Sequence, residues 1–124
     1  MREPGFLERE RHSPSLEYES FLKTKRREWP GNGIECGNLM SSLYPWQAAI
    51  VRWAVNKGRA AIWADCGLGK TTMQLAWALA LGVRTLIVTP LCVAAQTVAE
   101  GNKFGIDVSY APDDEHVGTS RIVV

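Results

Sequence analysis

The sequence predicts an α/β protein built on a parallel sheet, and three observations support this fold class. Short apolar runs alternate with segments whose apolar residues recur at helical spacing. One junction between such a run and a helical segment carries a glycine-rich stretch, residues 64–71 (ADCGLGKT). The run 84–89 is nearly continuous in apolar residues, as a strand covered on both faces should be. Strands that alternate with helices form βαβ units, so we expect a parallel sheet.

Composition bounds the size and class of the protein. With 124 residues, 46% of them hydrophobic, the chain can bury one modest core and is expected to form a single packed domain. A net charge of +1 gives no overall attraction to polyanions, so any such binding must be local. The three cysteines are odd in number and lack metal-site spacing, which argues against a disulfide framework and a zinc site.

The sequence shows neither a secretory signal nor a membrane span. Its first residues are charged, and no apolar stretch reaches the roughly 18 residues that a membrane helix needs. We therefore expect a soluble cytoplasmic protein with no membrane partner.

The first third of the chain differs in composition from the rest. We expect residues 1–42 to be an N-terminal extension, with a helix over about 16–28 capped by Ser15 and a linker over 30–42. The basic run 23–27 is either a solvated helix end or a contact with a nucleic-acid backbone. A packed domain is expected over 43–124.

The first helix of this domain is predicted to begin at Pro45 and to end near Asn56, with Gly58 as its terminator. Its expected buried face consists of apolar residues at helical spacing, Trp46, Ala49, Ile50, Trp53 and Ala54.

Strands and helices are predicted to alternate through the rest of the domain. Strands are expected at 60–64, 84–89, 106–110 and from 121 onward, and helices at 70–81, ended by Gly82, and at 91–100. Each of the tryptophans Trp53, Trp63 and Trp77 falls within an expected element, so all three are predicted to be core residues.

The glycine-rich stretch has the pattern and the context of a phosphate-binding P-loop. Glycines let successive backbone N–H groups turn toward a polyphosphate, and the following helix N-terminus adds partial positive charge. Lys70 would reach the β- and γ-phosphates and the Thr71 hydroxyl would hold Mg²⁺, so these two are the candidate catalytic residues. Ala64 stands where the common pattern has its first glycine. The candidate phosphate-contacting residues are Ala64, Cys66, Gly67, Leu68, Gly69, Lys70, Thr71 and Thr72.

Two flanking segments add to this motif. The first, Leu43-Tyr44-Pro45-Trp46-Gln47, lies about twenty residues upstream and ends in an amide that could match adenine's N6 and N7. Gln47 could equally be an ordinary exposed helix residue. The second, residues 86–91, ends a strand in a Thr-Pro turn. Thr89 and Pro90 are candidate nucleic-acid contacts, the alternative being a plain turn.

Together, these segments resemble the first motifs of superfamily 2 helicases and translocases, of the DEAD-like and chromatin-remodelling types and of phage or bacterial kind. Residues 43–47 look like the adenine-reading Q motif, 64–71 are similar to motif I, and 86–91 look like motif Ia. The resemblance covers about residues 43–110. It implies a partial RecA-like P-loop fold, ATP and Mg²⁺ as cofactors, and nucleic acid as the partner, DNA more than RNA.

The family places further parts downstream that this sequence does not contain. These are the Asp-Glu motif II, motif III and a second RecA-like domain with arginine fingers. Residues 113–116 (DDEH) mimic motif II, but Pro112 precedes them and the apolar strand follows, so a solvated loop is expected. Because the sequence stops within an apolar run at Val124, we expect a truncated enzyme part that is inactive alone.

Two other functions remain open at this stage. One is a non-catalytic module that binds nucleotide or nucleic acid. The other is a non-helicase P-loop NTPase or kinase, which would need a pocket for its acceptor and would not respond to nucleic acid.

Overall fold

The computed structural model describes residues 16–26 and 30–124; the predicted cap Ser15 and residues 27–28 of the predicted first helix lie outside the described residues. Within them the protein is of the mixed α/β class, with four helices and a three-stranded parallel sheet. In chain order the elements are α1 (Leu16–Lys25), α2 (Pro45–Lys57), α3 (Lys70–Leu81), β1 (Thr85–Leu86), α4 (Leu91–Lys103), β2 (Val108–Ser109), a 3-10 turn (Asp114–His116) and β3 (Ile122–Val123).

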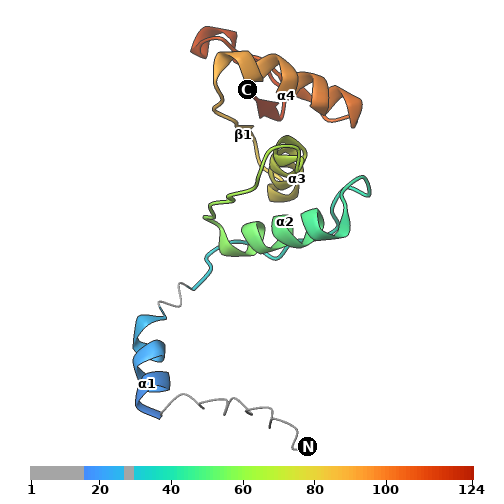
Figure 1. Ribbon diagram of the computed structural model, residues 1–124. Coiled ribbons are helices and arrows are strands. Elements are labelled where there is room, and N and C mark those ends of the chain that lie inside the picture. The colour runs from blue at the N-terminus through green and yellow to red at the C-terminus, as the bar shows by residue number, and fades with distance from the viewer. Residues whose placement is uncertain (1–15, 27–29) are drawn as a thin grey trace, which may run out of the picture.

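Helices α2, α3 and α4 are stacked, with α3 in the middle (Figure 1). Local signals set the bounds of the first two. Pro45 occupies the first turn of α2, where its missing N–H costs nothing. Gly58, at φ 76°, ends α2 by donating its N–H to Ala54 O and Val55 O, and Gly82, at φ 71°, ends α3. The predicted bounds of these two helices are thus confirmed to within a residue.

The sheet has the order β1-β3-β2, and both pairs are parallel. Ile122 of the central strand β3 is in register with Thr85 on one side and Val108 on the other. The last strand in the sequence is therefore the central strand of the sheet. The predicted strands at 84–89, 106–110 and 121–124 are present, but each is shorter than expected.

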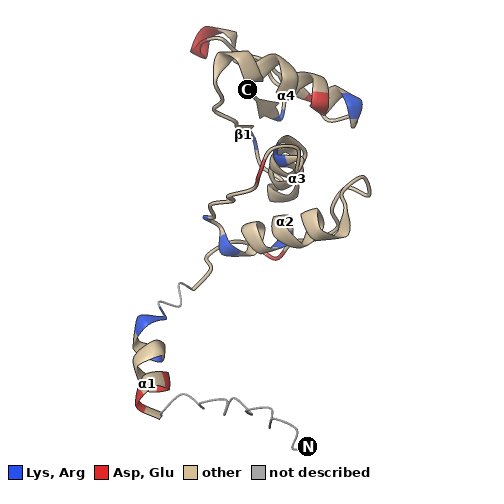
Figure 2. Cartoon of the chain, in the orientation of Figure 1, with Lys and Arg blue, Asp and Glu red and all other residues tan. Residues whose placement is uncertain are grey.

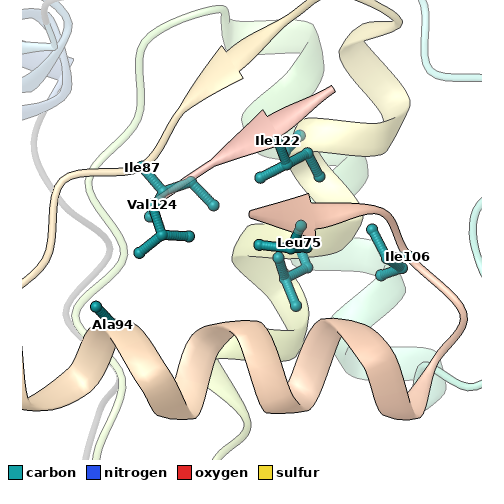
Figure 3. Close-up of a cluster of buried hydrophobic side chains, with 8 residues drawn as sticks. Leu75, Ile87, Ala94, Ile106, Ile122 and Val124 are labelled. Carbon is teal, nitrogen blue, oxygen red and sulfur yellow. The ribbon is translucent and has the colours of Figure 1, made fainter. Parts of the chain in front are cut away.

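Two clusters of buried side chains form the core. The first joins α3 and α4 to the sheet (Figure 3) and consists of Leu75, Ala78, Ile87, Ala94, Ile106, Val108, Ile122 and Val124. The second lies between α2 and α3 and consists of Leu43, Val51, Val55, Met73 and Ala76. Met40 and Trp77 pack against both clusters and connect them.

The buried face of α2 differs from the prediction. The structure buries Gln47, Val51, Ala54 and Val55, whereas Trp46 and Trp53 are exposed. Apolar residues cover more than half of the circumference of this helix, so the sequence pattern contains two overlapping stripes. Packing against α3 selects the stripe of Val51 and Val55, and the large tryptophans remain outside.

The predicted strand at 60–64 is not formed. The segment has no strand assignment, and Trp63 within it is 96% exposed. A strand needs a hydrogen-bonded neighbour, and in the described part of the chain β1 pairs only with β3. The prediction of Trp53 and Trp63 as core residues is therefore wrong, while Trp77 is partly buried.

One face of the sheet at β1 is uncovered. Leu86 and Val88 are 70% and 85% exposed, while Thr85 and Ile87, which alternate with them along the chain, are buried. The expectation that the run 84–89 is covered on both faces is thus wrong for this face. The first core cluster contains Ile87 but neither of these two exposed residues.

The segment before α2 packs against that helix. The N–H groups of Asn32, Gly33 and Ile34 donate to the last carbonyls of α2. A Cβ on Gly33 would lie 1.9 Å from Val55 O, so only glycine permits this approach. The predicted boundary between residues 42 and 43 stays a prediction.

Helix α1 stands apart from the three stacked helices in Figure 1. Its first turn is acidic and its last turn is basic, as Figure 2 shows, which suits the helix dipole. All of its residues are exposed. No helix in the described ranges is both long and apolar enough to span a bilayer.

Candidate phosphate-binding site

The loop 64–69 leads directly into the first turn of α3. Gly67 and Gly69 have φ values of 77° and 69°, a left-handed conformation that side chains rarely adopt. The space around the two glycines differs. A Cβ on Gly67 would meet nothing within 4 Å, whereas one on Gly69 would lie 2.6 Å from Gln47 Nε2. Gly69 is therefore favoured by its backbone conformation, and the end of the Gln47 side chain lies close to it.

Lys70, the first residue of α3, reaches back to the start of the loop. Its ammonium donates hydrogen bonds to Ala64 O at 3.0 Å and Asp65 O at 2.8 Å. The cation thus lies over the backbone of the loop, paired with carbonyl oxygens. Because the residue is exposed, a phosphate group could reach the same ammonium without crossing the core.

A carboxylate already accepts a hydrogen bond from one backbone amide of the loop. Asp65 Oδ1 accepts a hydrogen bond from Cys66 N at 2.7 Å, and both residues are exposed. The loop N–H is therefore aligned with an anionic oxygen acceptor, the chemical type that a phosphate also provides. Leu68, next along the loop, is exposed as well.

Gln47 is buried, with only 5% of its surface exposed, so the alternative of an ordinary exposed helix residue is wrong. Its side chain makes two hydrogen bonds to backbone atoms. Oε1 accepts from Tyr44 N at 3.0 Å, at the start of α2, and Nε2 donates to Leu68 O at 3.1 Å in the glycine loop. The structure thus brings the Gln47 side chain into contact with the glycine loop.

The two threonines in the first turn of α3 have different surroundings. Thr71 is half-buried. Thr72 is buried, and its hydroxyl donates to Glu100 Oε1 on α4 at 3.2 Å. Glu100 also lies 3.8 Å from Lys103 Nζ. No sequence signal pointed to Glu100, because the contact depends on how α4 crosses α3.

Thr89 and Pro90 join β1 to α4. Pro90 is the N-cap of α4 at φ −57° and is exposed, while Thr89 is half-buried. Val88 and Leu91 on either side are exposed apolar residues. A nucleic-acid contact at this turn stays a prediction.

The acidic run 113–116 lies in an exposed 3-10 turn. Asp113 Oδ1 accepts from His116 N at 3.0 Å and lies 2.5 Å from His116 Nδ1. The expectation of a solvated loop is confirmed.

A cavity of about 320 Å³ lies beside the loop, between α2, α3 and the extended segment 60–62. Its walls are mostly apolar, and Lys70 and Gln74 contribute polar groups. The cavity thus lies where the unpaired segment 60–62 meets α2 and α3. Its lining consists of Val51, Ala54, Ala60, Ile62, Lys70, Met73, Gln74 and Trp77.

The donors at the loop fit a polyphosphate and its metal. They are backbone N–H groups of a left-handed glycine loop, the Lys70 ammonium, and the Thr71 hydroxyl at a helix N-terminus. Compared with models of protein families, with curated proteins and with solved structures, the chain has no match.

Proposed function

We propose that this chain is the ATP-binding N-terminal part of a nucleic-acid helicase or translocase, with DNA as the favoured partner and Mg²⁺ as the metal. The observation that carries the proposal is the loop 64–69. Its two left-handed glycines precede a helix that begins at Lys70, and the lysine ammonium lies against the loop backbone. This arrangement supports phosphate binding more directly than any other in the described residues.

The proposed roles follow from the chemistry of each group. The loop amides and the N-terminus of α3 would accept the phosphate oxygens. The Lys70 ammonium would exchange its carbonyl partners for the β- and γ-phosphates, and the Thr71 hydroxyl would bind Mg²⁺. The resemblance implies two further roles. Gln47 would contact adenine, and Thr89 and Pro90 would contact a nucleic-acid backbone.

Binding is tested with the full chain and Mg-ATP by following amide resonances in a two-dimensional NMR titration. We expect shifts concentrated at residues 64–72. In Lys70→Met the dissociation constant should rise at least about tenfold, the effect of losing one charge-assisted contact. Lys23→Met on α1 removes an equal charge from an exposed site and should leave the affinity unchanged. Shifts scattered over α1 and α4 would argue against the site. So would dissociation constants that rise equally in Lys70→Met and Lys23→Met.

Turnover is a separate expectation. The acidic run 113–115 lies in an exposed turn and not at the end of a buried strand, so these carboxylates are not placed to orient an attacking water. In the family that the sequence resembles, arginine fingers come from a second RecA-like domain. Where measured in P-loop enzymes, such a finger is worth about 10³–10⁵ in rate. We expect negligible ATP hydrolysis by this chain, with or without single-stranded DNA. A Lys70-dependent rate of about one per second, an ordinary enzyme turnover, would contradict this.

Two further measurements, nucleotide binding with added single-stranded DNA and phosphate transfer to small-molecule acceptors, separate the other candidates. Nucleotide binding that single-stranded DNA does not change would favour a non-helicase P-loop protein. Transfer of phosphate to a small-molecule acceptor would favour a kinase.

A further inference from the structure

We propose that Gln47 is a positioning residue that shapes the phosphate loop, so that its removal weakens binding of the triphosphate itself, whether or not a base is attached. This inference rests on the proposed function, because it concerns the same loop. It assigns the Gln47 carboxamide to the loop backbone, whereas the resemblance assigns it to adenine.

Three observations place the Gln47 carboxamide against the loop. Nε2 donates to Leu68 O at 3.1 Å, between the two left-handed glycines. The same nitrogen lies 2.6 Å from the position that a Cβ of Gly69 would occupy, so it fits against the bare backbone there. The side chain is buried, which removes competing water from the hydrogen bond.

The other end of the carboxamide fixes its orientation. Oε1 accepts from Tyr44 N at the start of α2, as the third residue of a capping arrangement. Because the oxygen is held by the helix start, the NH₂ group must point toward Leu68. The helix α2, packed on α3 through Val51 and Val55, thereby becomes a rigid support for a glycine-rich loop.

The mechanical consequence concerns the backbone N–H groups that would hold phosphate. Glycines lose more conformational freedom on ordering than other residues, so an unsupported loop must be ordered when the ligand binds. A hydrogen bond at Leu68 O orders the loop beforehand. Such preorganisation improves affinity for whatever the loop amides bind, and it is independent of the base.

The test compares two ligands and matched variants of the full chain. The ligands are Mg-ATP and Mg-tripolyphosphate, which has no base or sugar. Gln47→Met keeps the size and neutrality of the side chain but removes both hydrogen bonds. Gln96→Met makes the same change at an exposed position of α4 and is the control. Gln47→Glu keeps the acceptor for Tyr44 N and loses the donor to Leu68 O, so it preserves the helix start.

We expect Gln47→Met to raise the dissociation constants of both ligands by the same factor, about five- to tenfold, as the loss of one hydrogen bond implies. Gln96→Met should change neither. In the ligand-free protein, the heteronuclear NOEs of Gly67 and Gly69 should fall in Gln47→Met and Gln47→Glu, while those of α3 stay high.

Two results would overturn the inference. One is a loss of affinity for ATP with unchanged affinity for tripolyphosphate, which would make Gln47 a base reader only. The other is an unchanged loop NOE in both Gln47 variants. If the unaltered chain binds neither ligand, the proposed function fails, and the NOE comparison still decides whether Gln47 orders the loop.

Discussion

Gly101 is the residue at which α4 approaches β2. It is buried, and a Cβ built on it would lie 2.5 Å from Val108 Cγ2 and 3.1 Å from Val108 Cβ. Val108 is itself buried and cannot move away without disturbing the first core cluster. A glycine in the last turns of a helix, unfavourable by helix propensity, is explained here by close packing on the sheet.

Gly101→Ala is therefore expected to destabilise the protein. The gain in helix propensity is about 1 kcal/mol, whereas overpacking of this kind costs about 1–3 kcal/mol. The net loss should be about 1 kcal/mol in the free energy of unfolding, measured by urea denaturation. Gly37→Ala, where an added Cβ meets nothing within 4 Å, should be nearly neutral. A more stable Gly101→Ala variant would mean that α4 lies farther from β2.

At the level of elements, the segment 60–64 is an apolar stretch without a hydrogen-bonded neighbour. Its composition is that of a strand, and it directly precedes the phosphate loop in the chain. Its burial is poor, as the exposed Ile62 and Trp63 show. The position of the loop is consequently set by α2 and α3 and not by a sheet.

Amide hydrogen exchange tests this description. The amides of residues 61–64 should exchange at nearly unprotected rates. Those of Ile87 and Val124, which donate to Val123 O and Ser109 O at 2.8 Å, should be protected to the level of global unfolding. Protection of 61–64 equal to that of Ile87 would show that the segment is a paired strand in solution.

The predicted elements agree with the structure where local chemistry decides. Pro45, Gly58 and Gly82 fix the ends of α2 and α3 through their backbone conformations, whatever surrounds them. The strands depend on partners far along the chain. Thr85 pairs with Ile122, and no local pattern encodes that pairing, so strand lengths were predicted less well than helices.

At the scale of the whole molecule, Met40 and Trp77 join the two core clusters. Helix α3 contributes Leu75 and Ala78 to one cluster and Met73 and Ala76 to the other. Since both clusters share this helix, neither can lose its packing without exposing part of the other.

We therefore expect a single cooperative unfolding transition that includes both core clusters. Midpoints from far-ultraviolet circular dichroism and from tryptophan fluorescence should coincide in thermal and urea denaturation. Leu75→Ala, which empties a fully buried site, should lower the stability by about 2–5 kcal/mol and shift both midpoints together. Two separate midpoints would contradict the shared role of α3.

By itself, the sequence determined the α/β class, the ends of two helices, and the placement of a glycine-rich loop before Lys70. These follow from backbone preferences and spacing, which act locally. Only the tertiary structure decided which stripe of α2 is buried, that 60–64 stays unpaired, and that Gln47 and Glu100 reach the loop and α3. Those outcomes depend on contacts between segments that are distant in the chain, so no local pattern could contain them.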